Sequence, residues 1–303
     1  MIRPIVCLTI ISMAGALIAS AQVGNSGMPL LKLSVTGRSL AMGYTSALED
    51  GPGAIQGNPA GVQYPAPASG TRLLFTHQEW IQDARTEFLG ASTPLSDSQT
   101  LCLSLLTTTV SNIEIRTVPG PAEGTFTSRD LALGLTYAQE LSEEVRAGVT
   151  VRYLYQKIFV NDATGYSFDA GVRVGLPVEG LDAGVAILNL GQMTVLQQER
   201  TKLPAMARGG LSYHYKPIDD ISLAVTGDLV RIFPEKRFYG GVGGEVWFQQ
   251  VVALRLGNEF GSDARGFAAG LGVAYGMFSL DYAFAKLSQD LGTTHTFTLG
   301  LVL

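Results

Sequence analysis

A two-residue alternation of apolar and non-apolar side chains runs through most of this sequence. Residues 144–156, EVRAGVTVRYLYQ, show it clearly: every second side chain from Val145 to Tyr155 is apolar, the intervening ones are charged, polar or glycine, and only Leu154 breaks the pattern. Residues 167–176, 266–276 and 296–303 repeat it. Successive side chains of a β-strand point to opposite faces, so each segment predicts a strand with one apolar face.

The number and length of these segments favour a membrane barrel. About 14 can be counted, an even number as in bacterial outer-membrane barrels, beginning near residues 71, 85, 99, 126, 145, 165, 180, 205, 220, 237, 251, 266, 277 and 294. Each has about ten residues or more, as a tilted membrane strand requires, whereas soluble strands average about five or six. We predict an all-β fold, an antiparallel transmembrane β-barrel of about 14 strands.

The connections between these segments differ in length in an ordered way. Short ones follow even-numbered segments, for example residues 95–98, 141–144, 177–180 and 216–220, and the two longest, 112–126 and 191–204, follow odd-numbered ones. The first and ninth connections are also short, so the sorting is incomplete. Outer-membrane barrels have short periplasmic turns and longer outer loops. The alternative, a soluble all-β fold, gives no reason for such sorting.

Composition agrees with this prediction. Charged residues make up 16% of the chain and the net charge is −5, while soluble domains have about 25% charged residues. The acidic balance and the lack of a basic cluster exclude a nucleic-acid surface. The apolar strand faces would contact outer-membrane lipid, with aromatic girdles near the strand ends. The predicted girdle residues are Tyr153, Tyr155, Tyr213, Tyr215, Phe248, Tyr275 and Phe284.

The N-terminus has the features of a secretory signal peptide. Arg3 precedes the apolar stretch 5–18, and Ala19-Ser20-Ala21 matches a cleavage site. We therefore expect residues 1–21 to be a signal peptide cleaved after Ala21, and the mature chain to reach the bacterial outer membrane. A spanning anchor is the alternative, but the stretch is short for one. Cleavage would leave Cys102 as the single cysteine, so no internal disulfide could form.

Residues 22–70 lack the alternation and are rich in small residues and turn formers. Residues 39–48 predict a short helix, and Asn58 before Pro59 predicts an Asx turn. The small residues on the predicted lumen face of segment 266–274 leave room for such a compact unit. We predict a plug or hatch over 22–70 and the barrel over 71–303. A flexible periplasmic leader is the alternative for 22–70.

Two short motifs carry a family resemblance. The N-terminal motif comprises Gly37, Arg38, Met42, Gly43, Asn58, Pro59, Ala60 and Gly61, and the C-terminal motif comprises Asp281, Tyr282, Phe284, Leu291, Gly292 and His295. Together they resemble the PorV/PorQ family, which looks related to FadL-type barrels with 14 strands and an N-terminal hatch. The resemblance implies a part in type IX secretion, with secreted cargo C-terminal domains or the secretion machinery as partners. Tyr44, where a second glycine is usual, departs from the pattern.

No catalytic, cofactor or metal motif is evident. The three histidines, His77, His214 and His295, are far apart in sequence, and GGVGGE, residues 240–245, alternates within a strand rather than opening a helix. We therefore expect a protein that is not an enzyme and that uses no cofactor. Charges on the predicted lumen face either form ion pairs that brace the wall and plug or line a polar pathway; Arg38 and Asp281 are one suggested pair.

Three functions remain open from the sequence. The first is a secretion-associated interaction barrel that shuttles or anchors partners through connections 112–126 and 191–204. The second is a FadL-like channel for hydrophobic small molecules, which needs an apolar pocket near the hatch and a lateral opening, often from a kinked strand. The third is a purely structural barrel.

Overall fold

The computed structural model describes residues 26–64 and 70–303. The predicted signal peptide and its cleavage site lie outside these residues, as do the two ends of the predicted plug, 22–25 and 65–69. Within the described part of the chain, no helix is both long enough and apolar enough to cross a membrane.

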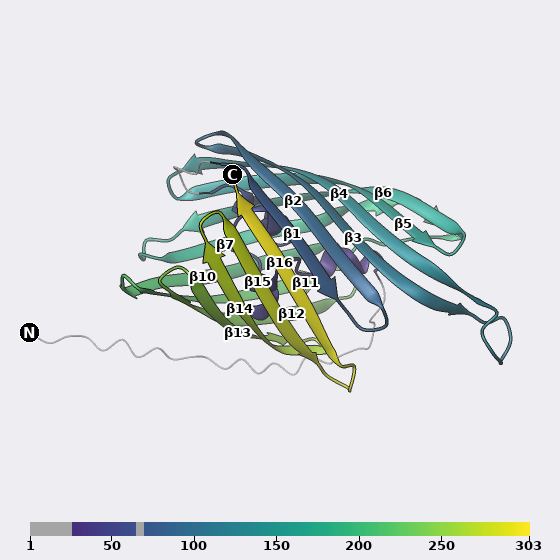
Figure 1. Ribbon diagram of the computed structural model, residues 1–303. Coiled ribbons are helices and arrows are strands. Elements are labelled where there is room, and N and C mark those ends of the chain that lie inside the picture. Colours follow the sequence, from purple (N-terminus) through teal and green to yellow (C-terminus); the bar gives the residue numbers. More distant parts are fainter. Residues whose placement is uncertain (1–25, 65–69) are drawn as a thin grey trace, which may run out of the picture.

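Fourteen strands form a closed antiparallel barrel, which confirms the predicted fold class (Figure 1). Each strand pairs with its neighbours in chain order, and β1 closes the barrel against β16. The barrel strands are β1 (Arg72–Glu79), β2 (Ala84–Ser96), β3 (Gln99–Ile115), β4 (Gly124–Ser142), β5 (Val145–Ile158), β6 (Asn161–Gly175), β7 (Leu181–Met193), β10 (Met206–Ile218), β11 (Ile221–Ile232), β12 (Arg237–Phe248), β13 (Val252–Phe260), β14 (Arg265–Tyr275), β15 (Phe278–Leu287) and β16 (Thr293–Val302). The first residues predicted for the 14 segments agree with the first residues of these strands to within a few positions.

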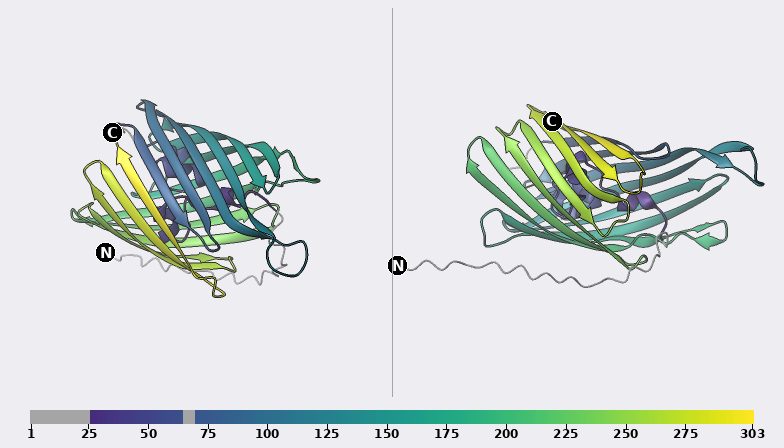
Figure 2. Two further views of the ribbon diagram at one scale, coloured as in Figure 1. Left: turned by 45° about the vertical axis from the view of Figure 1, so that its right-hand side comes forward. Right: turned by 90° about the horizontal axis from the view of Figure 1, so that it is seen from below.

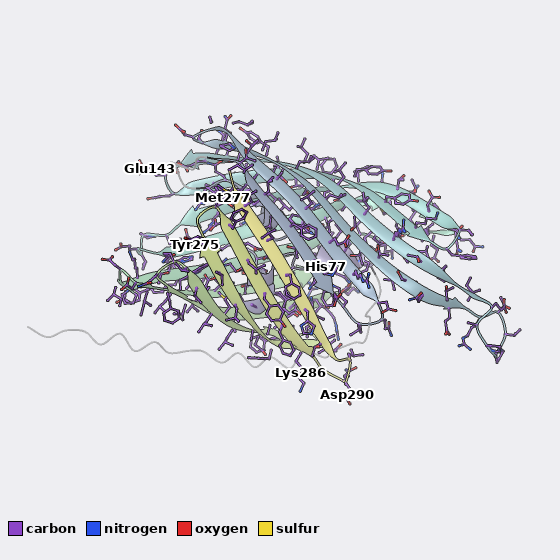
Figure 3. All side chains as sticks on the ribbon, in the orientation of Figure 1. His77, Glu143, Tyr275, Met277, Lys286 and Asp290 are labelled. Carbon is purple, nitrogen blue, oxygen red and sulfur yellow. The ribbon has the colours of Figure 1, made fainter. Side chains whose placement is uncertain are left out.

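The two ends of the barrel have connections of different length. At the end that we call the short-turn end, the connections are 97–98, 143–144, 176–180, 219–220, 249–251 and 276–277. At the opposite end, the long-connection end, they include 116–123 and 194–205, and the second of these carries the small hairpin of β8 (Val195–Leu196) and β9 (Glu199–Arg200). The two longest connections therefore lie at one end, as predicted. In Figure 3, Glu143, Tyr275 and Met277 mark the short-turn end, and Lys286 and Asp290 mark the other.

The outer face of the barrel carries an apolar band. On β5 the outward side chains from Val145 to Tyr155 are apolar, and Val149 and Val151 are each about half exposed. These ten residue steps cover about 33 Å along the strand, or about 25 Å across a bilayer at a tilt of about 40°. Beyond Tyr155 the next outward side chain is Lys157. The height of the band matches the apolar belt of outer-membrane barrels.

The N-terminal segment lies inside the barrel (Figure 2). It forms four short helices joined by turns: η1 (Pro29–Lys32), α1 (Gly37–Ala41), η2 (Pro52–Gln56) and η3 (Pro59–Val62). The helix predicted over 39–48 is wrong in its length. The α-helix ends at Ala41 because Gly43 and Tyr44 both adopt left-handed backbone angles, with φ of 72° and 64°, which turn the chain out of the helix.

The exception in the β5 alternation has a structural reason. Leu154 points into the lumen and is fully buried in a cluster that includes Ile55 of η2. Cys102 of β3 points inward into the same cluster and is also buried. An apolar side chain on the lumen face is therefore covered here by the segment inside the barrel.

Candidate functional site

Met42 and Gly43 of the N-terminal motif lie directly against glycines of the barrel wall. A Cβ on Gly257 would lie 2.1 Å from the Gly43 nitrogen, and a Cβ on Gly243 would lie 2.4 Å from the Met42 oxygen. Gly241 has the same close approach, at 2.3 Å from the Gly43 oxygen. No side chain fits at these positions. The glycine-rich stretch 240–245 therefore serves to bring the backbone of 42–43 against β12 and β13.

The later part of the motif is anchored on β5 and β6, and three strands lie between β6 and β12. The Asn58 Nδ2 donates to the Val172 carbonyl oxygen of β6 at 3.0 Å, and its Oδ1 accepts from the Ala60 N–H at 3.0 Å, which is the predicted Asx turn. Gly171 leaves room for the Asn58 side chain, and Gly148 of β5 leaves room for the backbone of Pro59. Asn58 to Gly61 thus link the interior segment to β5 and β6.

A chain of four charged side chains joins the interior segment to β12, β13 and β15. Arg38 makes two hydrogen bonds of 3.0 Å to the Glu245 carboxylate, which also accepts from Arg255, and Arg255 in turn pairs with Asp281. The suggested direct pair between Arg38 and Asp281 is therefore wrong. Two wall residues separate them, although the Asp281 backbone oxygen lies 3.3 Å from where a Cβ on Gly37 would be.

Asp228 of β11 holds the turn that follows α1. Its Oδ2 accepts the Ser46 N–H at 2.7 Å, the Ala47 N–H at 2.8 Å and the Arg208 Nη1 at 2.9 Å. Gly210 makes room for this carboxylate, because a Cβ there would lie 2.2 Å from the Asp228 Oδ1. The carboxylate is buried with all three donors in place, as a buried charge requires.

Other lumen charges are paired in the same way. The Arg152 guanidinium pairs with Asp169 and donates to the Ile55 carbonyl at 2.8 Å, and Arg173 pairs with Asp50. These contacts support the bracing interpretation of the lumen charges, because each cation binds either a wall carboxylate or the interior segment.

Glu49 is a buried acid in the interior segment. Burial raises the pKa of Glu49 to about 7, against the lowering effects of a hydrogen bond from the Thr36 hydroxyl and of the nearby Arg38 charge. The protonated form of this carboxyl group is therefore populated at neutral pH, unlike that of an exposed glutamate.

A partly polar, mainly apolar cavity of about 280 Å³ lies between the interior segment and the wall near the long-connection end. The interior segment contributes Leu33, Ser34, Gly43 and Tyr44. Wall side chains include Met206, Val230 and Ile232, and the connections add Trp80, Ile81 and Leu291. Four charged groups at its border form two ion pairs, Arg208–Asp228 and Arg265–Glu259, the second at 2.8 Å, whereas the Tyr44 hydroxyl and the Arg208 Nε make no hydrogen bond. The cavity offers apolar contact with few free polar groups.

A laterally opening wall would need a kinked strand, and one irregularity of the wall in the middle of its strands is a bulge whose polar groups are paired. The β6–β7 register shifts between Phe168 and Ala170, and Asn189 of β7 has a left-handed φ of 62°. The Asn189 N–H donates to the Asp169 Oδ1 at 2.6 Å, and its Nδ2 donates to the Leu31 carbonyl at 3.3 Å. This bulge therefore supports the interior segment.

The C-terminal motif residues do not form one site. Asp281 faces the lumen, whereas Tyr282, Phe284 and His295 lie on the outer face, where the Tyr282 hydroxyl and the His295 Nδ1 are 2.8 Å apart. Leu291 and Gly292 lie in connection 288–292, and of these two Leu291 reaches the cavity. Within residues 26–64 and 70–303, no group of three or more His, Cys, Asp or Glu is arranged to hold a metal ion.

The sequence analysis missed the cavity wall. Val230 and Ile232 face the lumen from β11, on the same face of the strand as Thr226 and Asp228. Apolar residues on an otherwise polar or small lumen face were the available signal, and they were not used.

Comparison with known proteins gives the fold. No protein-family model and no curated protein matches the chain. Among solved structures it is similar to the Ralstonia pickettii toluene transporter TbuX, with a TM-score of 0.59 and 13% identity over 90% of this chain and 98% of that one. The CymD monoaromatic hydrocarbon channel gives a TM-score of 0.63 at 10% identity, covering 89% and 97%.

A Pseudomonas aeruginosa FadL homologue gives a TM-score of 0.56 at 11% identity, covering 89% and 98%. At these identities the likeness shows the fold alone. The chain therefore has the fold of the FadL-type 14-stranded barrels. The PorV/PorQ resemblance receives no support from a family model.

Proposed function

We propose that the chain is an outer-membrane channel that admits small hydrophobic molecules. The observation that carries this proposal is the mainly apolar cavity of about 280 Å³ between the interior segment and β10–β12. The three solved structures of the same fold support it, because their names describe two hydrocarbon transporters or channels and a FadL homologue.

The size of the cavity limits the ligand. An engineered cavity of about 150 Å³ in another protein holds one benzene molecule, and cavities for drug-sized ligands begin near 300 Å³. A volume of about 280 Å³ therefore suits a hydrocarbon of one or two rings or a short aliphatic chain. Its apolar walls gain free energy from covering such a molecule and gain little from a charged one.

The orientation follows from the connections. Short turns face the periplasm in outer-membrane barrels and longer loops face outward. The cavity would then open toward the outside of the cell, and residues 26–64, the hatch, would separate it from the periplasm.

Direct binding of radiolabelled toluene to the detergent-solubilised protein tests the proposal. Val230→Trp places an indole in the cavity and should weaken toluene binding by about tenfold or more, because the ligand loses its space. Val225→Trp is the matched control, since Val225 lies on the same strand but points outward and is 60% exposed. Unchanged binding by Val230→Trp, or equal loss in both variants, would refute the assignment of this cavity.

A secretion-associated role is the second candidate, and the two sequence motifs are what favours it. Connections 112–126 and 191–204 contribute to the same end of the barrel, as a partner-binding surface would require. Co-purification from native outer membranes with secreted proteins that share a C-terminal domain would support this role. A barrel that carries small hydrocarbons and no such partner would support the channel.

A further inference from the structure

The outer face of the barrel is hollowed over five adjacent strands. A groove of about 970 Å³ extends across β6, β7, β10, β11 and β12. Its sides are formed by outward apolar side chains, among them Val185, Leu211, Leu229 and Val242, each about half exposed or more. This volume is at the upper end of the range for ligand sites.

The floor of the groove is bare because of two glycines that the rest of the protein does not require. A Cβ on Gly209 would have its nearest neighbour at 3.8 Å, and one on Gly227 at 3.7 Å, both ordinary contact distances. Neither glycine has a left-handed φ. By contrast, the inward Gly210, next to Gly209, has no room for a Cβ. The interior explains the inward glycines, but the outward ones only keep the groove open.

A guanidinium lies at the rim of the groove toward the long-connection end. Arg231 points outward one residue before β11 ends at Ile232, and its Cζ lies 4.3 Å from the centroid of the Phe238 ring. Among the described residues, no carboxylate forms an ion pair with it. The cation is therefore held over an aromatic ring at the edge of an apolar surface, with its donors available.

We propose that this groove binds one phosphate-bearing membrane lipid, with an acyl chain along the floor at Gly209 and Gly227 and the phosphate on Arg231. Charge complementarity selects this occupant. A guanidinium fork makes charge-assisted, bidentate hydrogen bonds to phosphate, and it lies where the apolar band ends. An acyl chain matches the apolar groove, which offers no other charged side chain at that rim.

The proposal rests on the outer-membrane placement proposed above and is independent of ligand entry into the lumen. The groove lies on the outer side of β10 and β11, whereas the cavity lies on the inner side of the same strands. A single experiment can therefore separate the two proposals.

Native mass spectrometry of the full chain in dodecyl maltoside tests it, with dimyristoyl phosphatidylglycerol as the probe. Arg231→Gln removes the charge, and Gly227→Leu fills the floor without a clash. Each should reduce the affinity for the first lipid by about tenfold, as expected when a charge-assisted hydrogen bond is lost or the site is blocked. Gly244→Leu is the matched control. Gly244 is another outward glycine with room for a side chain, but it lies outside the groove.

Three outcomes would overturn the proposal. The first is lipid retention that is equal in all variants, and the second is equal loss in Gly244→Leu. The third is equal binding of uncharged dimyristoylglycerol, which would mean that no phosphate is recognised. Toluene binding should be unchanged in Arg231→Gln. If the wild type binds the lipid but does not bind toluene, the result counts against the lumen channel alone.

Discussion

The Asp228 contacts predict which single side chain holds the hatch most strongly. In Asp228→Ala, the N–H groups of Ser46 and Ala47 lose their acceptor, and the Arg208 guanidinium loses its partner. Removing one partner of a buried ion pair costs about 3–5 kcal/mol, and each unpaired N–H adds about 1–3 kcal/mol. Because the site borders the cavity, water can form some of the lost hydrogen bonds and so reduce this cost. We expect the free energy of local hatch opening to fall by about 4 kcal/mol.

Hydrogen–deuterium exchange of the Leu40 and Met42 amides measures this opening, because these amides donate to backbone carbonyls of the hatch and not to Asp228. A loss of about 4 kcal/mol corresponds to about a thousandfold faster exchange. The control is Thr226→Ala, which removes a single neutral hydrogen bond to the same turn, at 2.7 Å to the Thr45 hydroxyl. That variant should lose only about 1 kcal/mol.

A double variant tests the physical reason. In Arg208→Leu combined with Asp228→Ala, no unpaired charge remains in the wall, so about half of the lost stability should return. The reasoning is refuted by either of two results. One is that Asp228→Ala exchanges no faster than Thr226→Ala. The other is that the double variant exchanges as fast as Asp228→Ala.

Three further predictions concern the hatch. The pKa of Glu49 is raised to about 7, so its stabilisation is complete below the ordinary pKa and is lost as pH rises through about 7. The protection factor of the hatch amides, which divides out the intrinsic pH dependence of amide exchange, should fall from pH 5 to pH 8 by up to about 3 kcal/mol in opening free energy, and Glu49→Gln should abolish this fall. Gly257→Val places a side chain on the Gly43 backbone, and limited proteolysis should then cleave the hatch while the barrel stays folded. Although burial opposes it, hydrogen bonds from Lys32 and Ser26 lower the pKa of Glu235. The protection factor of the amides near Lys32 should therefore fall only as pH drops below the ordinary value of about 4.3, and not in Glu235→Gln.

The barrel was predictable from the sequence because its governing pattern is local. A strand whose two faces meet different surroundings must alternate, and the alternation alone locates the first residues of β5 and β14 to within one position. The hatch was harder, since its conformation depends on the wall around it. The helix ends early at Ala41 because the backbone of Gly43 packs against glycines of β12 and β13. The residues 39–48 alone do not indicate this contact.

The Arg38 partner shows a second limit. Glu245 and Arg255 lie directly opposite each other in the β12–β13 register, so they form the pair that Arg38 joins, and Asp281 lies two strands farther on. The alternation says that all of these side chains face the lumen, but it does not give their distances around the circumference. Those distances come from the register, which the turns fix.

Within one strand, a single residue step separates the two proposed sites. On β11, Val230 faces the cavity and Arg231 faces the groove, while Gly227 and Asp228 repeat the same division nearer the middle of the wall. A lumen-facing position that is apolar is covered by the hatch, as Leu154 is, or lines an internal cavity, as Val230 does. Gly227 is an outward glycine with room for a side chain on the floor of the groove, where the proposed acyl chain would fill that room. On β11, therefore, the residues that depart from what their own face requires mark the two proposed sites, one on each face of the wall.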